Sequence, residues 1–462
     1  MRPLLLALLG VALFLMPAVP APAPGLASLD CDPACNVRVT SVTGPANEVM
    51  VAVDPTDPNN LIAVAKDYNN AAGPACSAHN VWMGVYTSHD GGRTWANQLM
   101  PGYPGDDTLN LLSLFDCSSD PVVTFDGKGR ALATGIGVKT APTGDILASG
   151  IWVAQSFDKG ATWPVQGIAA AGPSILHDKQ WIVADPVTGG AFLGWAVITP
   201  IGAIPVMARS HDGIVWQPPL LPVNGFNTVP ELEQGTGISF ALGGPHPFAN
   251  VADIYMTWVD GREITEALSI DGGGAWEHYE HVDTIVPISR PNTPYRTPNF
   301  PSTAVAPAIG FNFAVHFTSW ADQRFGSPDI VVTNSTDNGH HPFGPAVRIT
   351  DDPPGPNVQF FPVLATGPDG CIHALWYDRR DDPGNYKNGV YYSRSCDGWG
   401  DVWSPNLKVA DPSDPAPSFH QDGQMFIGDY IGLTVGSDNV AHAVWTDTRN
   451  GRADVYTARI LP

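Results

Sequence analysis

Side chains that could transfer protons or attack a substrate recur at one spacing in this 462-residue chain. They stand six residues before a turn that ends an apolar segment. The residues at this position are Glu48, Asp120, Lys179, Phe361 and Tyr430, upstream of turn residues Asp54, Asp126, Asp185, Gly367 and Gly436. If the segments are equivalent strands, these side chains gather at one end of them, where an apolar residue would be usual. Asp178 directly precedes Lys179, so its carboxylate belongs to the same group of candidate residues.

The elements that position these residues belong to a repeat. Ser-x-Asp-x-Gly-x-Thr-Trp occurs twice without defect, from Ser88 to Trp95 and from Ser156 to Trp163, and a third time from Ser269 to Trp276 with Ala275 in place of Thr. Degenerate copies begin at Ser210, Ser335 and Ser395. The pattern predicts a hairpin turn in which the Asp side chain accepts hydrogen bonds from backbone amides and Gly adopts a positive φ. We therefore interpret these residues as structural.

A second repeated motif, Trp-x-Asp-x-Arg, ends an alternating apolar strand in four places. The copies are Trp258–Arg262, Trp320–Arg324, Trp376–Arg380 and Trp445–Arg449. A residue that recurs in four units is more often architectural than catalytic, so we interpret its Asp and Arg as inter-strand ion pairs. The same arginines could also hold a substrate carboxylate bidentately, and we retain Arg324, Arg380 and Arg449, together with Arg296, as candidates for that role.

Together the motifs define a unit of four strands, a to d, with the turn motif, an Asp box, between c and d. The b strands fall near residues 62, 131, 190, 254, 313, 371 and 440. This spacing predicts an all-β propeller, with seven blades preferred and six if one unit is an insertion. The last unit stops before a fourth strand, which residues 36–40 could supply.

This topology places the a–b turns and Asp boxes on one face, the bottom, and the b–c loops and d–a connections on the other, the top. The register of an antiparallel pair sets Cys371, at the start of a b strand, opposite Cys396, at the end of a c strand. Cys76 and Cys117 both fall on the top face, which leaves Cys31 and Cys35 as a local pair. Six cysteines are typical of an exported chain stabilised by disulfides.

Residues 1–27 combine one positive charge, an apolar run and small residues, which is typical of a secretory signal. We expect residues 28–462 to form one secreted propeller domain, a monomer without metal or cofactor. The net charge of −22 argues against binding to nucleic acid or to an anionic membrane. An acidic surface would also repel an acidic glycan, unless arginines gather locally.

The Asp boxes and their spacing resemble the sialidase superfamily, the proteins with Asp-box (BNR) repeats, over nearly the whole mature chain. The resemblance implies an exo-sialidase-like glycoside hydrolase in which an arginine triad holds a carboxylate, a Tyr paired with Glu is the nucleophile and an Asp is the acid/base. Its Arg-Ile-Pro signature is absent here; the nearest stretches are Tyr295–Pro298 and Phe360–Pro362.

Carried over to this chain, the resemblance makes Tyr430 the nucleophile and Glu48 its base, because a closed ring brings the last blade beside the first. Glu231 and Glu233 compete with Glu48 for that role, and Asp67 or Asp120 would be the acid/base. Arg296, Arg324, Arg380, Arg449, Lys179 and Asp178 are the substrate-binding candidates. Convergence of three arginines near Tyr430 would favour the enzyme.

The alternative is a non-catalytic propeller that binds glycans or proteins through its top face, with Tyr430 as a packed aromatic residue bonded to a loop carbonyl. His420 and Asp422 could line the same rim.

Overall fold

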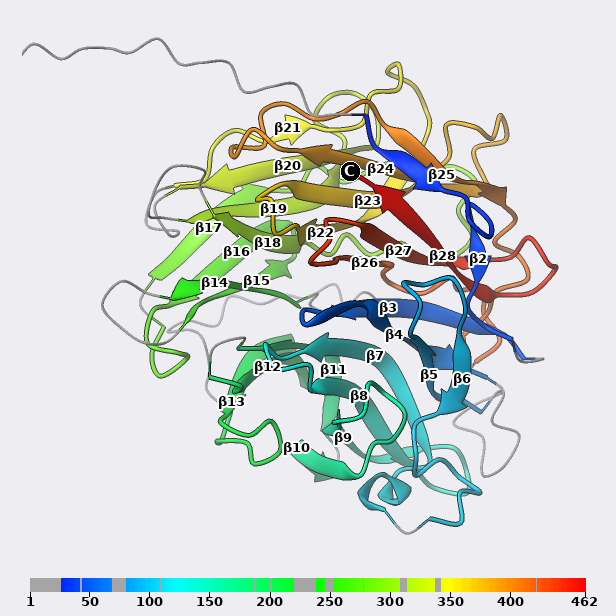
Figure 1. The fold of residues 1–462 in the computed structure, drawn as a ribbon, viewed down its shortest axis with the longest axis vertical. Helices are drawn as coiled ribbons and strands as arrows, with labels where there is room; N and C mark the ends of the chain where they lie inside the picture. Colours follow the sequence, from blue (N-terminus) through cyan, green and yellow to red (C-terminus); the bar gives the residue numbers. More distant parts are fainter. Residues whose placement is uncertain are drawn as a thin grey trace, which may run out of the picture.

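The computed structural model describes residues 26–462 except for 42–43, 69–79, 109, 174, 186–187, 200–201, 220–237, 246–251, 277, 308–313, 337–341 and 421. In this part of the chain, seven antiparallel sheets are arranged in a ring (Figure 1). The one helical element described there is a short 3-10 turn, η1 (Leu111–Leu114). The predicted all-β propeller with seven blades is confirmed, and the six-blade alternative is wrong.

The blades follow one another in chain order. The first comprises β3 (Ala46–Asp54), β4 (Asp57–Asp67), β5 (Trp82–Ser88) and β6 (Ala96–Leu99). The second comprises β7 (Cys117–Phe125), β8 (Ala131–Thr140), β9 (Ile146–Ser156) and β10 (Val165–Pro173). In the third, the described strands are β11 (Leu176–Ala184), β12 (Ala191–Thr199) and β13 (Gly202–Ser210).

The remaining blades have the same order. The fourth comprises β14 (Ile238–Pro245), β15 (Ala252–Asp260), β16 (Glu263–Ser269) and β17 (His278–Thr284). The fifth comprises β18 (Ser302–Pro307), β19 (Ala314–Asp322), β20 (Asp329–Ser335) and β21 (Val347–Arg348). The sixth comprises β22 (Gln359–Thr366), β23 (Ile372–Asp378), β24 (Asn388–Ser395) and β25 (Leu407–Ser413). The seventh comprises β26 (Gly432–Val435), β27 (Ala441–Asp447) and β28 (Asp454–Leu461), joined by β1 (Ser28–Asp30) and β2 (Val37–Arg38).

The first strand of each blade is the innermost. Each of these strands contacts its counterpart in the next blade, and β26 contacts β3, which closes the ring. The core lies between blades, where the second and third strands bury large side chains; Trp82, Trp152, Trp195, Trp320, Trp376 and Trp445 are among the largest that are fully buried. Burial of this aromatic area is a main stabilising contribution to such a fold.

The N-terminal segment completes the seventh blade, as the sequence predicted for residues 36–40. Val37 and Arg38 of β2 pair with Thr457 and Tyr456 of β28. The same edge also pairs with β1, where Ser28 lies opposite Leu461, a contribution that the sequence did not predict. Figure 1 shows these first strands beside the last one. The first and last described strands therefore lie in one sheet.

The Asp boxes form the predicted turns. Asp90 Oδ1 accepts hydrogen bonds from the backbone N–H of Thr94 at 2.9 Å, and Asp158 Oδ1 accepts from that of Thr162 at 2.8 Å. Gly92 and Gly160 have φ of 88° and 86°. A side chain of the neighbouring blade can also cap the box, since Gln98 Nε2 donates to the Gly160 carbonyl at 2.7 Å. The boxes thus stabilise both a hairpin and a contact between blades.

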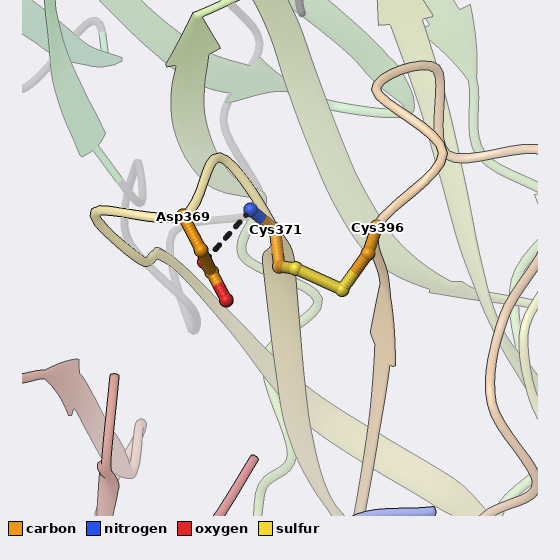
Figure 2. A group of neighbouring side chains, drawn as sticks. All are labelled: Asp369, Cys371 and Cys396. Carbon is orange, nitrogen blue, oxygen red and sulfur yellow. Dashed lines mark hydrogen bonds between the residues drawn. A yellow bond between two sulfur atoms is a disulfide. The ribbon is translucent and has the colours of Figure 1, made fainter. Parts of the chain in front are cut away.

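Two predicted disulfides are confirmed, Cys371–Cys396 (Figure 2) and Cys31–Cys35. Cys117 is also disulfide-bonded, but its predicted partner, Cys76, lies outside the described residues. Asp369, Cys371 and Cys396 form a group with the geometry of metal ligands. Their sulfur atoms are consumed in the disulfide, and Asp369 Oδ1 accepts a hydrogen bond from the Cys371 N–H. This group is therefore a structural bridge.

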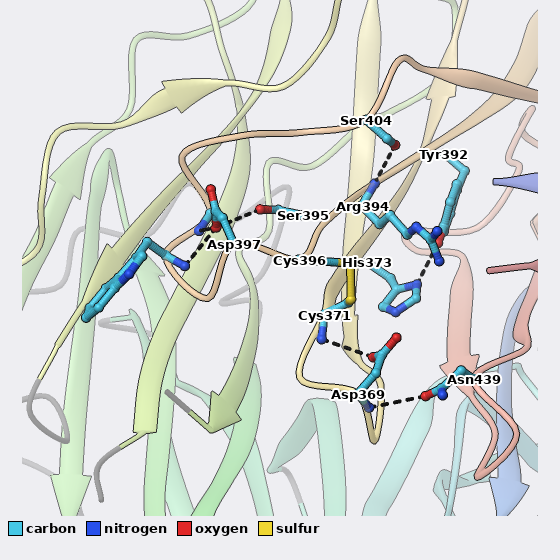
Figure 3. Close-up of a disulfide and its surroundings, with 12 residues drawn as sticks. Asp369, Cys371, His373, Tyr392, Arg394, Ser395, Cys396, Asp397, Ser404 and Asn439 are labelled. Atoms are coloured by element: carbon cyan, nitrogen blue, oxygen red, sulfur yellow. Dashed lines mark hydrogen bonds between the residues drawn. A yellow bond between two sulfur atoms is a disulfide. The ribbon is translucent and has the colours of Figure 1, made fainter. Parts of the chain in front are cut away.

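Polar contacts surround that bridge (Figure 3). His373 Nδ1 lies 2.6 Å from the Tyr392 hydroxyl, and the Asp369 N–H donates to Asn439 Oδ1 of the seventh blade at 3.2 Å. Burial lowers the pKa of His373 to about 4. The bridge consequently lies where the sixth and seventh blades meet on the bottom face.

Among the described residues, no helix is long and apolar enough to cross a membrane.

Candidate active site at the central channel

Four inner strands carry the same backbone irregularity at their top ends. Glu48, Asp120, Lys179 and Phe361 have φ between 53° and 54°. At each of these residues the strand pairing shifts register, as in a β-bulge. A left-handed conformation costs about 1–3 kcal/mol for such residues, and bulges re-aim side chains beside functional sites. The predicted alignment of these strands is confirmed.

In the seventh blade the alignment is different. Tyr430 lies two residues before β26, and the positive φ belongs to Gly428, at 97°. A Cβ at Gly428 would lie 2.7 Å from the Glu48 Cα. Only glycine allows the last blade to approach the first so closely.

The bulges bring charged groups from four blades together. Lys66 Nζ lies 3.0 Å from Glu48 Oε2 and 3.7 Å from Asp120 Oδ1. Lys179 Nζ lies 2.9 Å from Asp120 Oδ2 and 2.5 Å from Asp429 Oδ2. These five residues, with Asp178 and Arg296, form what we call the channel cluster.

Two members of the channel cluster are partly exposed. The Arg296 side chain is 38% exposed and that of Asp178 is 28% exposed, whereas those of Glu48 and Asp429 are fully buried. Arg296 donates to both carboxylate oxygens of Asp429, from Nε at 2.9 Å and from Nη2 at 2.6 Å. Asp178 lies 4.0 Å from Lys179 Nζ. A ligand that entered from the top would meet Asp178 and Arg296 first.

The carboxyl groups of the cluster have opposite pKa shifts. Burial raises the pKa of Glu48 to about 7, and the charge of Asp120 adds to the increase, although Lys66 and Lys179 oppose it. Burial acts in the same direction on Asp120, but there Lys179 and Lys66 outweigh it, so its pKa falls below the usual range. Burial also raises the pKa of Asp178. Neighbouring carboxyls with separated pKa values are suited to acid/base division of labour.

A hairpin of residues 418–426 covers the cluster. Asn47, next to Glu48, anchors it by donating to the Phe419 carbonyl at 2.8 Å and to the Phe426 carbonyl at 3.3 Å. The Phe426 ring lies 5.0 Å from Lys66 Nζ and 4.9 Å from the Arg296 Cζ. Such cation–π contacts compensate part of the lost hydration of the two cations.

His420 and Asp422, which the sequence placed on the rim, belong to this hairpin. His420 Nδ1 lies 3.3 Å from Asp422 Oδ1. Burial and the charge of Lys66 lower the pKa of His420 to about 4. The imidazole is therefore neutral at physiological pH.

Tyr430 lines the channel, but its hydroxyl donates to the Pro121 carbonyl at 3.2 Å. Its ring packs edge-on against Trp181, with centroids 6.0 Å apart. Burial, followed by the charges of Glu48, Asp120 and Asp429, raises its pKa well above the usual value. These contacts correspond to the packed aromatic residue that the sequence left as an alternative.

Asp67, a predicted acid/base, makes its described side-chain hydrogen bond with Tyr86 and not with a member of the channel cluster. It is buried and accepts a hydrogen bond from the Tyr86 hydroxyl at 2.8 Å. Successive side chains of a strand point to opposite faces, so on β4 it is the preceding residue, Lys66, that reaches Glu48. Glu231 and Glu233, the other predicted candidates, lie outside the described residues.

Three of the four candidate arginines bind the Asp of their own Trp-x-Asp-x-Arg motif. Each Asp also accepts from the indole N–H of that motif. The pairs are Arg324–Asp322, Arg380–Asp378 and Arg449–Asp447. Arg324 Nη1 also lies 2.6 Å from Asp283 of β17, and Arg380 Nη1 lies 2.6 Å from Asp351, beyond β21. The Asp and Arg of each motif thus pair within one segment and not between strands as predicted, while Arg324 and Arg380 also reach an Asp of the preceding blade.

Lys66 and Asp429 were missed by the sequence analysis. Lys66 directly follows the apolar run from Leu61 to Ala65 and precedes Asp67, the residue that was predicted as a possible acid/base. Asp429 immediately precedes Tyr430. A search for charged residues next to apolar strand segments would have found Lys66. Asp429 joins the cluster only because the ring closes, which the sequence around it does not show.

A small cavity of about 50 Å³ reaches the cluster. Its walls include Asp120, Lys179, Asp429, Tyr430, Phe300 and Phe361. A volume of this size holds water molecules rather than a sugar ring.

No family model and no curated protein matches this chain. Solved structures do match. The GH93 α-L-arabinofuranosidase of Fusarium graminearum in complex with arabinobiose is 12% identical, with 92% of this chain and 96% of that chain covered and a TM-score of 0.50. The leech intramolecular trans-sialidase is also 12% identical, with 79% and 68% covered and a TM-score of 0.45.

Another match is the NanB sialidase of Streptococcus pneumoniae, 12% identical, with 91% of this chain and 69% of that chain covered and a TM-score of 0.42. Sialidases are thus among the solved structures that this chain resembles. At such identities the likeness shows the fold alone: this chain is a seven-bladed β-propeller.

Proposed function

We propose that this chain is an exported glycoside hydrolase whose reaction takes place at the channel cluster. One observation carries the proposal: four blades share the left-handed bulge, but three place Glu48, Asp120 or Lys179 there and one places Phe361. Phe361 shows that the backbone does not need a charged side chain in this conformation. The buried charges in the other blades therefore call for a functional reason.

The cluster offers the two carboxyl groups that glycoside hydrolysis requires. Asp178 is partly exposed and has a raised pKa, so it is suited to protonate the leaving oxygen as the glycosidic C–O bond breaks. Asp120 faces the cavity and is held ionised by two lysines, so it is suited to stabilise the positive charge that develops on the sugar. Water then supplies the hydroxyl to the sugar and returns a proton to Asp178.

A sialidase-type reaction is the more specific form of this proposal. It would use Tyr430 with Glu48, and several arginines on the substrate carboxylate. Arg296 is the one arginine that contacts the channel cluster among the described residues, and the Tyr430 hydroxyl is bonded to a carbonyl. These contacts favour carboxylate chemistry at Asp178 and Asp120 over a tyrosine nucleophile.

A binding module is the second candidate. Complete burial of Glu48 and the pairing of each cluster cation with a carboxylate favour it, because such a network can also serve to hold blades together. Export rests on residues 1–27 in either case, and the disulfides fit an oxidising compartment.

The test is hydrolysis of a panel of aryl glycosides that includes sialosides, α-L-arabinofuranosides and common hexosides. Asp178→Asn and Asp120→Asn should each lower kcat/KM about 100-fold or more. The matched control, Asp158→Asn in a bottom-face Asp box, should stay within about twofold of wild type. Sugar binding by calorimetry without turnover of any substrate would favour the binding module.

A further inference from the structure

We infer that the channel cluster takes a neutral saccharide rather than a sugar acid, an inference that rests on the proposed glycan site. Recognition of a carboxylate is strongest at a cation whose charge no carboxylate of the protein balances, above all at a free arginine fork. Each cation of the cluster already faces a carboxylate of the protein. The ligand class follows from how these pairs are made.

Arg296 is the most exposed cation of the cluster, and one edge of its guanidinium, formed by Nε and Nη2, is occupied. Nε and Nη2 both donate to Asp429, which is itself fully buried. Its guanidinium also lies against the Phe426 ring. A substrate carboxylate could reach only the remaining Nη1 edge of a guanidinium whose charge Asp429 already balances, and on the Nε–Nη2 edge it would have to displace Asp429, which would then remain buried beside Lys179.

The two lysines are deeper and equally engaged. Lys66 contacts Glu48 and Asp120, and Lys179 contacts Asp120 and Asp429. Their side chains are 2% and 6% exposed. Neither ammonium group is presented to a ligand at the mouth.

No other Lys or Arg of the described residues joins the cluster. Arg2 apart, every Lys and Arg of the sequence belongs to the described residues, and the segments left out of the description beyond residue 25 contain neither. Within the described residues, no further Lys or Arg contacts a carboxylate of the cluster. Arg324, Arg380 and Arg449 are bound to the Asp residues of their own motifs.

The charge balance leads to the same conclusion. Four carboxyl groups face three cations, and Asp178, the exposed carboxyl, has no cation closer than Lys179 Nζ at 4.0 Å, although its Oδ1 accepts a hydrogen bond from the Lys179 N–H at 2.9 Å. A second carboxylate beside an ionised Asp178 would add like charge in a partly desolvated place, and a protonated Asp178 offers no positive charge to hold one. Hydroxyl groups can instead donate hydrogen bonds to Asp178, since carboxylates only accept.

The test is calorimetric binding at low ionic strength of sugar pairs that differ only in a carboxylate: glucose with glucuronic acid and galactose with galacturonic acid, with N-acetylneuraminic acid and arabinose as further probes. The neutral member should bind at least 10-fold more tightly in the pair that the site accepts. Asp178→Asn should reduce that ratio several-fold by removing the repulsion, whereas Asp158→Asn on the bottom face should leave it unchanged.

Equal or tighter binding of a sugar acid by the wild type would overturn the inference. So would a neutral preference that Asp178→Asn leaves intact in a variant with an unchanged melting temperature. Failure to bind every probe would overturn both the inference and the glycan site. Neutral preference without any hydrolysis would overturn only the proposed reaction, so the two failures can be told apart.

Discussion

Glu48 is the residue whose ionisation most affects the cluster. Its side chain is fully buried, and it contacts Lys66 at 3.0 Å and Lys179 at 3.9 Å. Both lysines also serve Asp120, which holds the charged state more strongly. When Glu48 carries a proton, three carboxylates of the cluster face three cations. Burial, and then the charge of Asp120, therefore raises the pKa of Glu48 to about 7 even beside two ammonium groups.

Glu48→Gln should therefore remove a pH dependence of stability. The pKa of Glu48 is raised to about 7 in the folded chain from 4.5. The folded state then binds more protons than the unfolded state between these values, so the free energy of unfolding of the wild type should fall by a few kcal/mol as pH rises through that window. The Gln variant should lack this decrease. Denaturant unfolding of both proteins from pH 4.5 to 8 measures the difference, and parallel curves would contradict the assignment.

Tyr430→Phe tests the alternative chemistry at the same site. The substitution removes a hydroxyl whose described partner is the Pro121 carbonyl at 3.2 Å, so stability should change by about 1 kcal/mol or less. If carboxylates carry the reaction, turnover should stay within about tenfold of wild type. A loss of several orders of magnitude with an unchanged melting temperature would restore Tyr430 as the nucleophile.

At the scale of elements, the equivalent positions at the ends of the inner strands could be predicted from the sequence because the turn residues fix the count of positions along each strand. Glu48, Asp120, Lys179 and Phe361 follow that count. Tyr430 does not, because the seventh blade enters its inner strand through Gly428, whose φ of 97° changes the path. The left-handed bulge itself carries no signal in residues as different as Glu, Asp, Lys and Phe.

Lys66 and the hairpin of residues 418–426 show why the rest of the site could not be predicted. The hairpin is held by Asn47, which is more than 370 residues away in sequence. Its Phe426 contacts Lys66 on β4 of the first blade and Arg296 in the connection between the fourth and fifth blades. These residues come together only after the ring has closed. Periodicity identifies the strands, but it does not determine which loop folds over the channel.

The Asp boxes make a prediction at this scale. Asp158 accepts hydrogen bonds from the Thr162 N–H at 2.8 Å, the Thr162 hydroxyl at 2.6 Å and the Ser156 hydroxyl at 2.8 Å. Asp158→Ala should lower the free energy of unfolding by about 1–3 kcal/mol and leave sugar affinity within about twofold, because the box lies on the bottom face. Thermal unfolding and calorimetry measure the two quantities, and lost affinity at an unchanged melting temperature would contradict a structural role.

At the scale of the whole molecule, the closure of the ring and the channel cluster depend on each other. Glu48 and Lys66 come from the first blade and Asp429 precedes the first strand of the last one, while Lys179 lies 2.5 Å from Asp429 and 3.9 Å from Glu48. The N-terminal strands pair with β28 on the outer side of the same junction. Arg38 and Thr40 contact Asp454 there, at 2.8 and 3.1 Å. A change that weakens the closure of the ring should therefore also disturb the contacts of the channel cluster.

A chain that begins at Ser41 tests this coupling against one that begins at Ser28. Removal of β1 and β2 takes five residue pairs from β28 and exposes its edge, which invites pairing between molecules. At about 1 kcal/mol for each lost backbone hydrogen bond, the melting temperature should fall by roughly 5 °C. Sugar binding should weaken as well, because the first and last blades can separate beneath the cluster, and size-exclusion chromatography should show association. If the shortened chain instead melts like the control and binds sugar equally well, the N-terminal strands do not hold the ring closed.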